Sequence, residues 1–319
     1  MKRSYYISII LFSFLLISCN KDENDIIVET KNRTYNFVLV SSDTDLSSGW
    51  LAGDTIGITP YISDSEKIYS NYINKRYTTN DNGTFAPATT EDKIVHPLAG
   101  QTVDFFAYYP YKANVFTSYA ISLIEQSNQK LIDLLYSNNA KNKTNTSGNI
   151  EFVFNHVLSK IIVNTIPSGS LKKEDLHGMS ITINNVYDEG TFNLMYGYIE
   201  TSAPKSSIKM KTEADGSSSE AVILPGSASD TSFTIELANG NIYSANFPKE
   251  QQFISGHIHT YNVTITQTGI VLSPIEIEDW IMHGDYPEEE IADEIVYKTG
   301  DFYPNPGNPN TAIDRKSVV

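Results

Sequence analysis

Two histidines spaced by one residue are the strongest candidates for metal chemistry in this sequence. His257 and His259 belong to a run that alternates apolar and polar residues, which predicts a strand with both imidazoles on one face. A zinc site needs that arrangement together with further ligands. No carboxylate or cysteine lies within a few residues of the pair, and Tyr261 and Val263 share its face. We therefore predict that both histidines line the inner start of the strand, with no metal site.

Motifs for nucleophilic catalysis and phosphate binding are absent. The sequence contains no Gly-x-Ser-x-Gly turn and no glycine-rich phosphate loop between a strand and a helix. His156 has no neighbouring base, which favours a packed, hydrogen-bonded histidine. A glycoside hydrolase needs two carboxylates about 5–10 Å apart, and the 38 acidic residues permit such a pair without defining one. We predict no catalytic residue, no cofactor and no enzymatic activity.

Aromatic side chains offer another route to ligand binding. Trp50, Trp280 and the pair Tyr108 and Tyr109 have rings that can stack on sugars. Each ring stands in a strand-like motif, which favours a place in the core. A sugar-binding surface is the alternative, and the exposure of these rings decides between the two.

The N-terminal segment has the form of an export signal. Lys2 and Arg3 precede an apolar run from Tyr5 to Ile17. The run is shorter than the roughly 20 residues that a membrane-spanning helix needs, so residues 1–18 are predicted to be a cleaved signal peptide.

The only cysteine lies directly after this signal. Leu16-Ile17-Ser18-Cys19 resembles the bacterial lipobox, in which the cysteine becomes the lipidated N-terminus. Cleavage between Ser18 and Cys19 and lipidation of Cys19 are therefore expected. A single cysteine also excludes an intramolecular disulfide.

Composition favours an exported β-protein over a nucleic-acid-binding one. The net charge of −15 repels phosphate backbones, and no basic patch offsets it, so no nucleic-acid partner is expected. The 20 tyrosines and 14 phenylalanines favour pleated, half-buried surfaces. About 300 residues remain after the signal peptide, which at roughly 100–200 residues per domain predicts two domains.

Period-two alternation supports an all-β fold. It recurs in the stretches beginning at Tyr35, Met179, Phe233 and Tyr261, each with one apolar face. Asn-, Asp- and Gly-rich turns separate these runs, as in antiparallel sandwiches. The segment from Ala120 to Tyr136 is ambiguous and predicts either one helix or two short strands.

Changes in composition divide the chain into successive segments. The stretch from Ser137 to Asn149 is rich in Ser, Asn, Lys and Thr and is interpreted as a linker. The predicted organisation is a signal peptide (1–18), a polar linker (19–27), an N-terminal β-sandwich (28–136), a linker (137–149), a C-terminal β-sandwich (150–282) and an acidic, proline-rich tail (283–319).

An ordered set of short motifs resembles the fimbrillin family, in its Mfa-like branch of surface lipoproteins related to type V pilins. Each motif alone is weak, but the ordered set is fairly specific and covers roughly residues 28–282. The motifs are Trp50-Leu51-Ala52-Gly53-Asp54-Thr55-Ile56-Gly57-Ile58, Asp104-Phe105-Phe106-Ala107-Tyr108-Tyr109-Pro110, Phe154-Asn155-His156-Val157-Leu158-Ser159-Lys160-Ile161, Thr191-Phe192-Asn193, Val222-Ile223-Leu224-Pro225, Phe253-Ile254-Ser255-Gly256, Tyr261-Asn262-Val263-Thr264 and the closing strand Ile277 to Trp280.

The resemblance implies two transthyretin-like β-sandwich domains on a lipid-anchored fimbrial subunit or adhesin of the outer membrane, exposed at the cell surface. It also implies sister subunits as partners. In polymerising members a trypsin-like protease removes the first strand, here Thr34 to Ser41, and a strand from the next subunit fills the groove. The role of an adhesin also implies a further partner, which is a ligand on a host or bacterial surface.

One departure from the family pattern bears on this role. No Lys or Arg occurs between Ser41 and Glu66, so the expected processing site is missing. An unprocessed anchor or accessory subunit, or a stand-alone adhesin that keeps its lipid, fits better than a polymerising stalk. The alternative is a surface glycan-binding lipoprotein that serves nutrient uptake.

Overall fold

The structure is a computed structural model that describes residues 33–39, 50–80, 83–201, 204–273 and 276–280. The predicted cleavage and lipidation residues Ser18 and Cys19, the linker 19–27 and the tail 283–319 lie outside the described residues. Strands dominate, and the helices within the described ranges are three short 3-10 helices, η1 (Thr90–Asp92), η2 (Gln129–Leu131) and η3 (Lys173–Leu176). The all-β prediction is confirmed. Among the residues described, no helix is long and apolar enough to cross a membrane.

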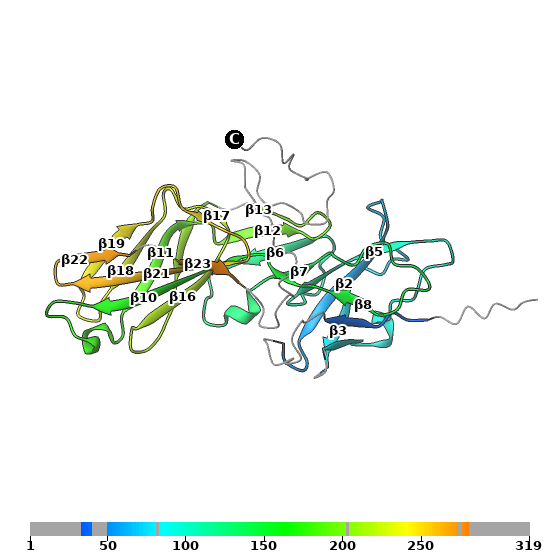
Figure 1. Ribbon diagram of the computed structural model, residues 1–319, viewed down its shortest axis with the longest axis horizontal. Helices are drawn as coiled ribbons and strands as arrows, with labels where there is room; N and C mark the ends of the chain where they lie inside the picture. The colour runs from blue at the N-terminus through cyan, green and yellow to red at the C-terminus, as the bar shows by residue number, and fades with distance from the viewer. Residues whose placement is uncertain (1–32, 40–49, 81–82, 202–203, 274–275, 281–319) are drawn as a thin grey trace, which may run out of the picture. The chain divides into compact units, whose positions relative to one another are not determined.

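The first sheet has eight strands and includes the N-terminal strand of the described chain (Figure 1). In spatial order its members are β8 (Ile150–Phe152), β1 (Phe37–Leu39), β4 (Thr84–Pro87), β3 (Lys75–Thr79), β2 (Thr55–Ile62), β5 (Val103–Tyr109), β7 (Leu135–Ser137) and β9 (Asn155–His156). All neighbouring strands are antiparallel except β1 and β8. The first strand therefore lies inside the sheet, with a partner on each side.

Aromatic rings form the core beneath this sheet. Tyr35 and Phe37 are buried as their alternation predicts, and Phe37 has no exposed surface. Its ring stacks on Phe152 at 5.5 Å and meets the edges of Phe105 and Tyr77 at 5.5 and 5.0 Å. Rings packed in offset and edge-on geometry stabilise a core beyond their buried area. The first strand is thus part of the hydrophobic core.

The remaining strands form four smaller sheets (Figure 1). The six-stranded sheet contains β15 (Lys211–Thr212), β16 (Ser218–Ile223), β10 (Ser159–Pro167), β21 (His257–Thr266) and β22 (Gly269–Leu272), with β23 (Glu276–Asp279) paired to the start of β21. The others are a four-stranded sheet of β14 (Ser206–Lys209), β11 (Ser180–Val186), β18 (Ser232–Glu236) and β19 (Ile242–Asn246), a three-stranded sheet of β13 (Tyr198–Thr201), β12 (Glu189–Asn193) and β6 (Ser118–Ser122), and the pair β17 (Gly226–Ser227) and β20 (Gln252–Phe253).

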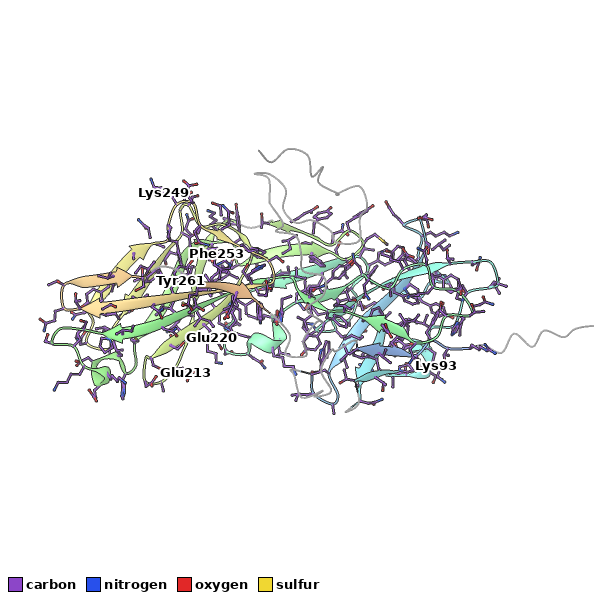
Figure 2. The ribbon with its side chains drawn as sticks, viewed as in Figure 1. Lys93, Glu213, Glu220, Lys249, Phe253 and Tyr261 are labelled. Carbon is purple, nitrogen blue, oxygen red and sulfur yellow. The ribbon has the colours of Figure 1, made fainter. Side chains whose placement is uncertain are left out.

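A second hydrophobic core contains the alternating faces predicted for β11, β18 and β21. The alternating residues predicted to face the core, such as Ile181, Phe233 and Val263, are buried, whereas the residues between them are half-buried or exposed. Phe247 joins Phe253 and Tyr261 by edge-on contacts at 5.3 and 5.0 Å. Phe253 and Tyr261 are labelled in Figure 2. The period-two alternation therefore predicted the buried face of each strand correctly.

The ambiguous segment from Ala120 to Tyr136 forms strands. It contains most of β6, the 3-10 helix η2 and the start of β7. β6 pairs with β12, so that Tyr119 lies opposite Phe192. Of the two forms predicted for this segment, two short strands is the correct one.

The segment predicted as a linker, 137–149, packs along the first sheet. Ala140 is buried, and its carbonyl accepts a hydrogen bond from the Phe105 N–H at 2.9 Å. Lys143 exchanges two backbone hydrogen bonds with Val103. On the far side of this segment, β8 and β9 also join the first sheet. The division into two transthyretin-like domains stays a prediction.

Candidate functional site

The two histidines considered for metal binding have separate partners. The His257 Nδ1 atom lies 2.8 Å from the carbonyl oxygen of Ser255, and its Nε2 atom lies 3.0 Å from Asp279. His259 is fully buried, and its Nε2 accepts a hydrogen bond from the Ile254 N–H at 2.9 Å. The sequence interpretation missed Asp279 because β23 brings this carboxylate to the strand from a distant position. Among the described residues, no three histidine, cysteine or carboxylate side chains gather as metal ligands.

Burial makes His259 a weak base. Loss of solvation disfavours the imidazolium and lowers the pKa of His259 to about 4, and repulsion from His257 acts in the same direction. The Nδ1 atom of His259 is buried without a hydrogen-bond partner in the described structure. These features describe a neutral core histidine.

His156 has a carboxylate neighbour that its local sequence does not reveal. Its Nδ1 lies 3.0 Å from Asp133, and its ring stacks on Trp280 with centroids 4.0 Å apart and planes at 9°. A histidine paired with a carboxylate can orient a nucleophile. Within the described ranges, however, no hydroxyl or thiol hydrogen-bonds to the His156 ring. The contacts of His156 instead connect β9 to Asp133 and to Trp280, the residue that follows β23. We interpret the role of His156 as structural.

The aromatic residues considered for sugar stacking contribute to cores. Tyr108 is fully buried and Tyr109 is 6% exposed. Trp50 is half-buried and meets Tyr109 at 5.1 Å, while one face of Trp280 is covered by His156. Burial also raises the pKa of Tyr108 above its ordinary value, so its phenol stays protonated. These rings do not form an exposed platform, and the prediction of core aromatics is confirmed for both tyrosines.

A cleft of about 460 Å³ lies beside the first strand. The cleft opens at the point where the chain entering β1 stops pairing with the segment around Ile94 and begins to pair with β4. The Tyr35 N–H bonds to the Ile94 carbonyl at 3.2 Å, whereas Phe37 pairs with Phe85 of β4. Pro87 at the end of β4 has no N–H to offer to β1, so the ladder stops there.

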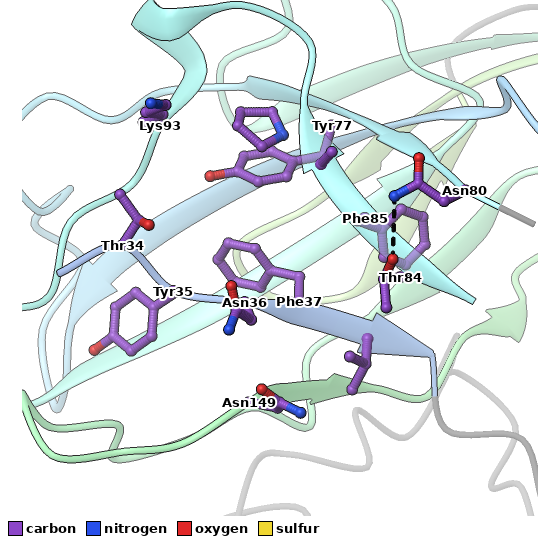
Figure 3. A pocket seen from close by; sticks show the side chains of 13 residues that line it. Thr34, Tyr35, Asn36, Phe37, Tyr77, Asn80, Thr84, Phe85, Lys93 and Asn149 are labelled. Carbon is purple, nitrogen blue, oxygen red and sulfur yellow. Dashed lines mark hydrogen bonds between the residues drawn. The ribbon is translucent and has the colours of Figure 1, made fainter. Parts of the chain in front are cut away.

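Uncharged polar side chains, five apolar residues and one lysine line this cleft (Figure 3). Five of its residues come from the first strand and the segment directly before it. The described lining residues are Thr34, Tyr35, Asn36, Phe37, Val38, Tyr77, Asn80, Thr84, Phe85, Ala86, Pro87, Lys93 and Asn149. None of them is Asp or Glu, although the chain carries 38 acidic residues.

The polar groups of the cleft are held on a rigid base. Phe37 and Tyr77 are buried, and the Tyr77 hydroxyl accepts a hydrogen bond from the Ile94 N–H at 3.0 Å. Burial raises the pKa of Tyr77, so the phenol stays neutral. The Asn80 amide donates to the Thr84 hydroxyl at 3.1 Å, as Figure 3 shows. The cleft is therefore formed before any ligand arrives, which is typical of small-molecule sites.

Sequence reasoning did not find this cleft. Asn36, Lys93 and Asn149 are far apart in the chain and lie in segments without a recognisable motif. The one local signal is Pro87, because a proline that ends a strand interrupts its hydrogen-bond ladder.

Two solved structures from Bacteroides species have chains similar to this one. A structure described as a candidate cell adhesion protein of Bacteroides uniformis superposes with a TM-score of 0.68 and 27% identity, over 79% of this chain and 99% of the other. A second structure with that description, from Bacteroides ovatus, has a TM-score of 0.63 at 21% identity over 78% of this chain and 98% of the other, which shows a shared fold.

The sequence comparisons extend this likeness along most of the chain. A candidate fimbrium subunit of Bacteroides uniformis, Fim1C, is 28% identical over 299 residues, which cover 88% of this chain and 96% of the other. The sequence profile of the family described as fimbrillin-like matches residues 20–280. The chain belongs to the fimbrillin-like family.

Proposed function

We propose that this chain is a fimbrial subunit or adhesin that acts at the cell surface. Membership of the fimbrillin-like family supports this role, as does the similarity to a candidate fimbrium subunit and to a candidate cell adhesion protein. The family relationship likewise supports a structural rather than an enzymatic role.

Strand addition is the proposed mode of assembly with sister subunits. The observation that supports it best is the position of β1, which pairs with β4 on one side and β8 on the other while Phe37 lies in the aromatic core. Without this strand, two ladders of backbone groups and an apolar slot would be left open. A strand from another subunit has the shape and hydrogen-bonding groups to fill such a slot.

We further propose that this subunit keeps its first strand, so that its own slot stays closed and strand addition involves the slot of a sister subunit, and that it acts as an anchor or accessory subunit. Lys and Arg are absent between Ser41 and Glu66, so a trypsin-like protease has no site directly after β1. The next basic residue, Lys67, follows β2, a strand that is buried along six of its eight residues. Cleavage at Lys67 would remove β2 together with β1 and would open the core.

The proposed anchor is a lipid on Cys19, after removal of residues 1–18, that holds the protein at the outer membrane. The lipobox-like sequence Leu16-Ile17-Ser18-Cys19 supports it. The two-domain organisation proposed from the sequence would place both sandwiches beyond this anchor.

Mass spectrometry of the mature N-terminus tests the proposal most directly. Outer-membrane and sheared surface fractions would be immunoblotted in parallel. We expect a lipidated Cys19 on intact protein, together with larger assemblies that contain it. A mature N-terminus beyond Ser41 in sheared polymers would instead assign a stalk role. Intact lipoprotein that never associates with other subunits would contradict a role in assembly.

A further inference from the structure

The cleft beside β1 has the opposite local charge from the protein as a whole. Lys93 is the only charged side chain among its described lining residues, whereas the net charge of the chain is −15. Lys93 is exposed and forms no ion pair within the described structure. A second cleft, of about 450 Å³, contains both Lys209 and Glu236 and has no such bias. The first cleft therefore favours a ligand with one negative charge.

The same balance of charge argues against a polyanion. A nucleic acid or polyphosphate would bring many negative charges onto an acidic surface with a single lysine to receive them. A ligand with one carboxylate avoids that repulsion.

The neutral side chains of the cleft indicate what else the ligand carries. Asn36 and Asn149 are exposed and present amide groups that both donate and accept hydrogen bonds. Thr34 adds a hydroxyl at the same cleft, and Val38 and Pro87 add small apolar surfaces. Amides and hydroxyls around an apolar contact suit a ring with several hydroxyl groups, and the volume lies within the range of about 300–1,000 Å³ of small-ligand sites.

We propose that this cleft binds the single acidic sugar unit of a short oligosaccharide. Lys93 pairs with the carboxylate, and the amides of Asn36 and Asn149 bond to sugar hydroxyls. This inference goes beyond the proposed role in assembly and stands independently of it.

The site also links ligand binding to the first strand. Residues 34–38 supply five of the lining residues, so the cleft exists only while that strand occupies its place. A ligand that binds only the protein with β1 in place stabilises that form of the protein. Occupancy of the cleft therefore opposes loss of β1.

Titration followed by NMR chemical shifts tests the proposal at low ionic strength, because salt screens an exposed ion pair. The probe is a disaccharide of one glucuronic acid and one galactose, and the comparators are the galactose–galactose disaccharide and acetate. We expect saturable binding of the acidic disaccharide with a Kd of about 1 mM and much weaker binding of both comparators. At about ten times this Kd, the midpoint of thermal unfolding should rise by about 3 °C.

Two substitutions at exposed positions test whether binding depends on the cleft rather than on another part of the surface. Lys93→Gln should weaken binding about tenfold, and Asn36→Ala about threefold. Lys67→Gln removes the same charge from an exposed position outside the cleft and should leave the Kd unchanged. The proposal is overturned by equal binding of the neutral disaccharide or acetate, by an unchanged Kd in Lys93→Gln, or by no saturation at concentrations up to about 20 mM.

Discussion

His259 gives the folded state a dependence on pH that arises from a single side chain. Its pKa of about 4 in the folded protein lies below its ordinary value of 6.5 because burial disfavours the charged imidazole. Above pH 6.5 both the folded and the unfolded chain hold the neutral form. As the pH falls from 6.5 towards 4, the unfolded chain binds a proton that the folded chain does not bind. The free energy of unfolding therefore falls as the pH drops across this window.

We expect the free energy of unfolding to fall by up to about 3 kcal/mol between pH 6.5 and pH 4 through this one group. His259→Gln places an amide oxygen where Nε2 accepts the Ile254 N–H, so it should flatten this part of the profile. Urea unfolding at a series of pH values measures the effect. His177→Gln removes an exposed histidine and is the matched control. A steep profile retained in His259→Gln would show that another group is responsible.

At the scale of the strand, local pattern and long-range pairing differ in how well the sequence predicts them. Alternation in β11, β18 and β21 identified the buried face of each strand, because neighbouring side chains point to opposite faces of a sheet. It could not show that Phe37 lies beside Ile150, since partner choice depends on contacts between distant segments. For the same reason the cleft and the pair of His156 with Asp133 were not predicted.

The aromatic contacts of β1 predict a large cost for shortening one side chain. Phe37 is fully buried among the rings of Phe105, Tyr77 and Phe152. Phe37→Ala should lower the free energy of unfolding by about 3–5 kcal/mol, because it removes these contacts and leaves a cavity. Val38→Ala, on the half-buried opposite face, should cost less than about 1 kcal/mol. Equal losses in both variants would contradict the placement of β1 in the core.

Cutting the chain after β1 tests whether this strand can be exchanged. A protease site inserted between Ser41 and Ser48 would allow cleavage of the purified, folded protein. We expect the released strand to leave only slowly, because β1 is paired on both sides. After mild denaturation and removal of the fragment, a peptide of residues 34–41 should bind and restore the original thermal midpoint.

A peptide in which Phe37 is replaced by Ala controls for specificity in this exchange. It keeps the backbone hydrogen bonds of the strand but lacks the buried ring, so it should bind much more weakly. If the cleaved protein kept its original thermal midpoint without any peptide, β1 would not be the strand that completes the sheet.

At the scale of the whole molecule, one residue is expected to decide where the protein resides. Lipid chains on Cys19 would anchor the protein because each methylene buried in a bilayer contributes about 0.8 kcal/mol. Cys19→Ala should therefore shift the protein from the outer-membrane fraction to the soluble fraction. Its thermal midpoint should match that of the parent, since the strands lie from Phe37 onwards in the described structure.

Asn20→Ala retains the cysteine and should remain in the membrane fraction, which separates loss of the lipid from a general effect on export. Detergent partitioning and mass spectrometry of both variants give the readout. If Cys19→Ala stayed with the outer membrane, the anchor would have to be sought elsewhere. Retention by contact with other surface subunits would then be the first alternative to measure, because a protein held by strand pairing is released by denaturant, whereas a lipidated protein is released by detergent.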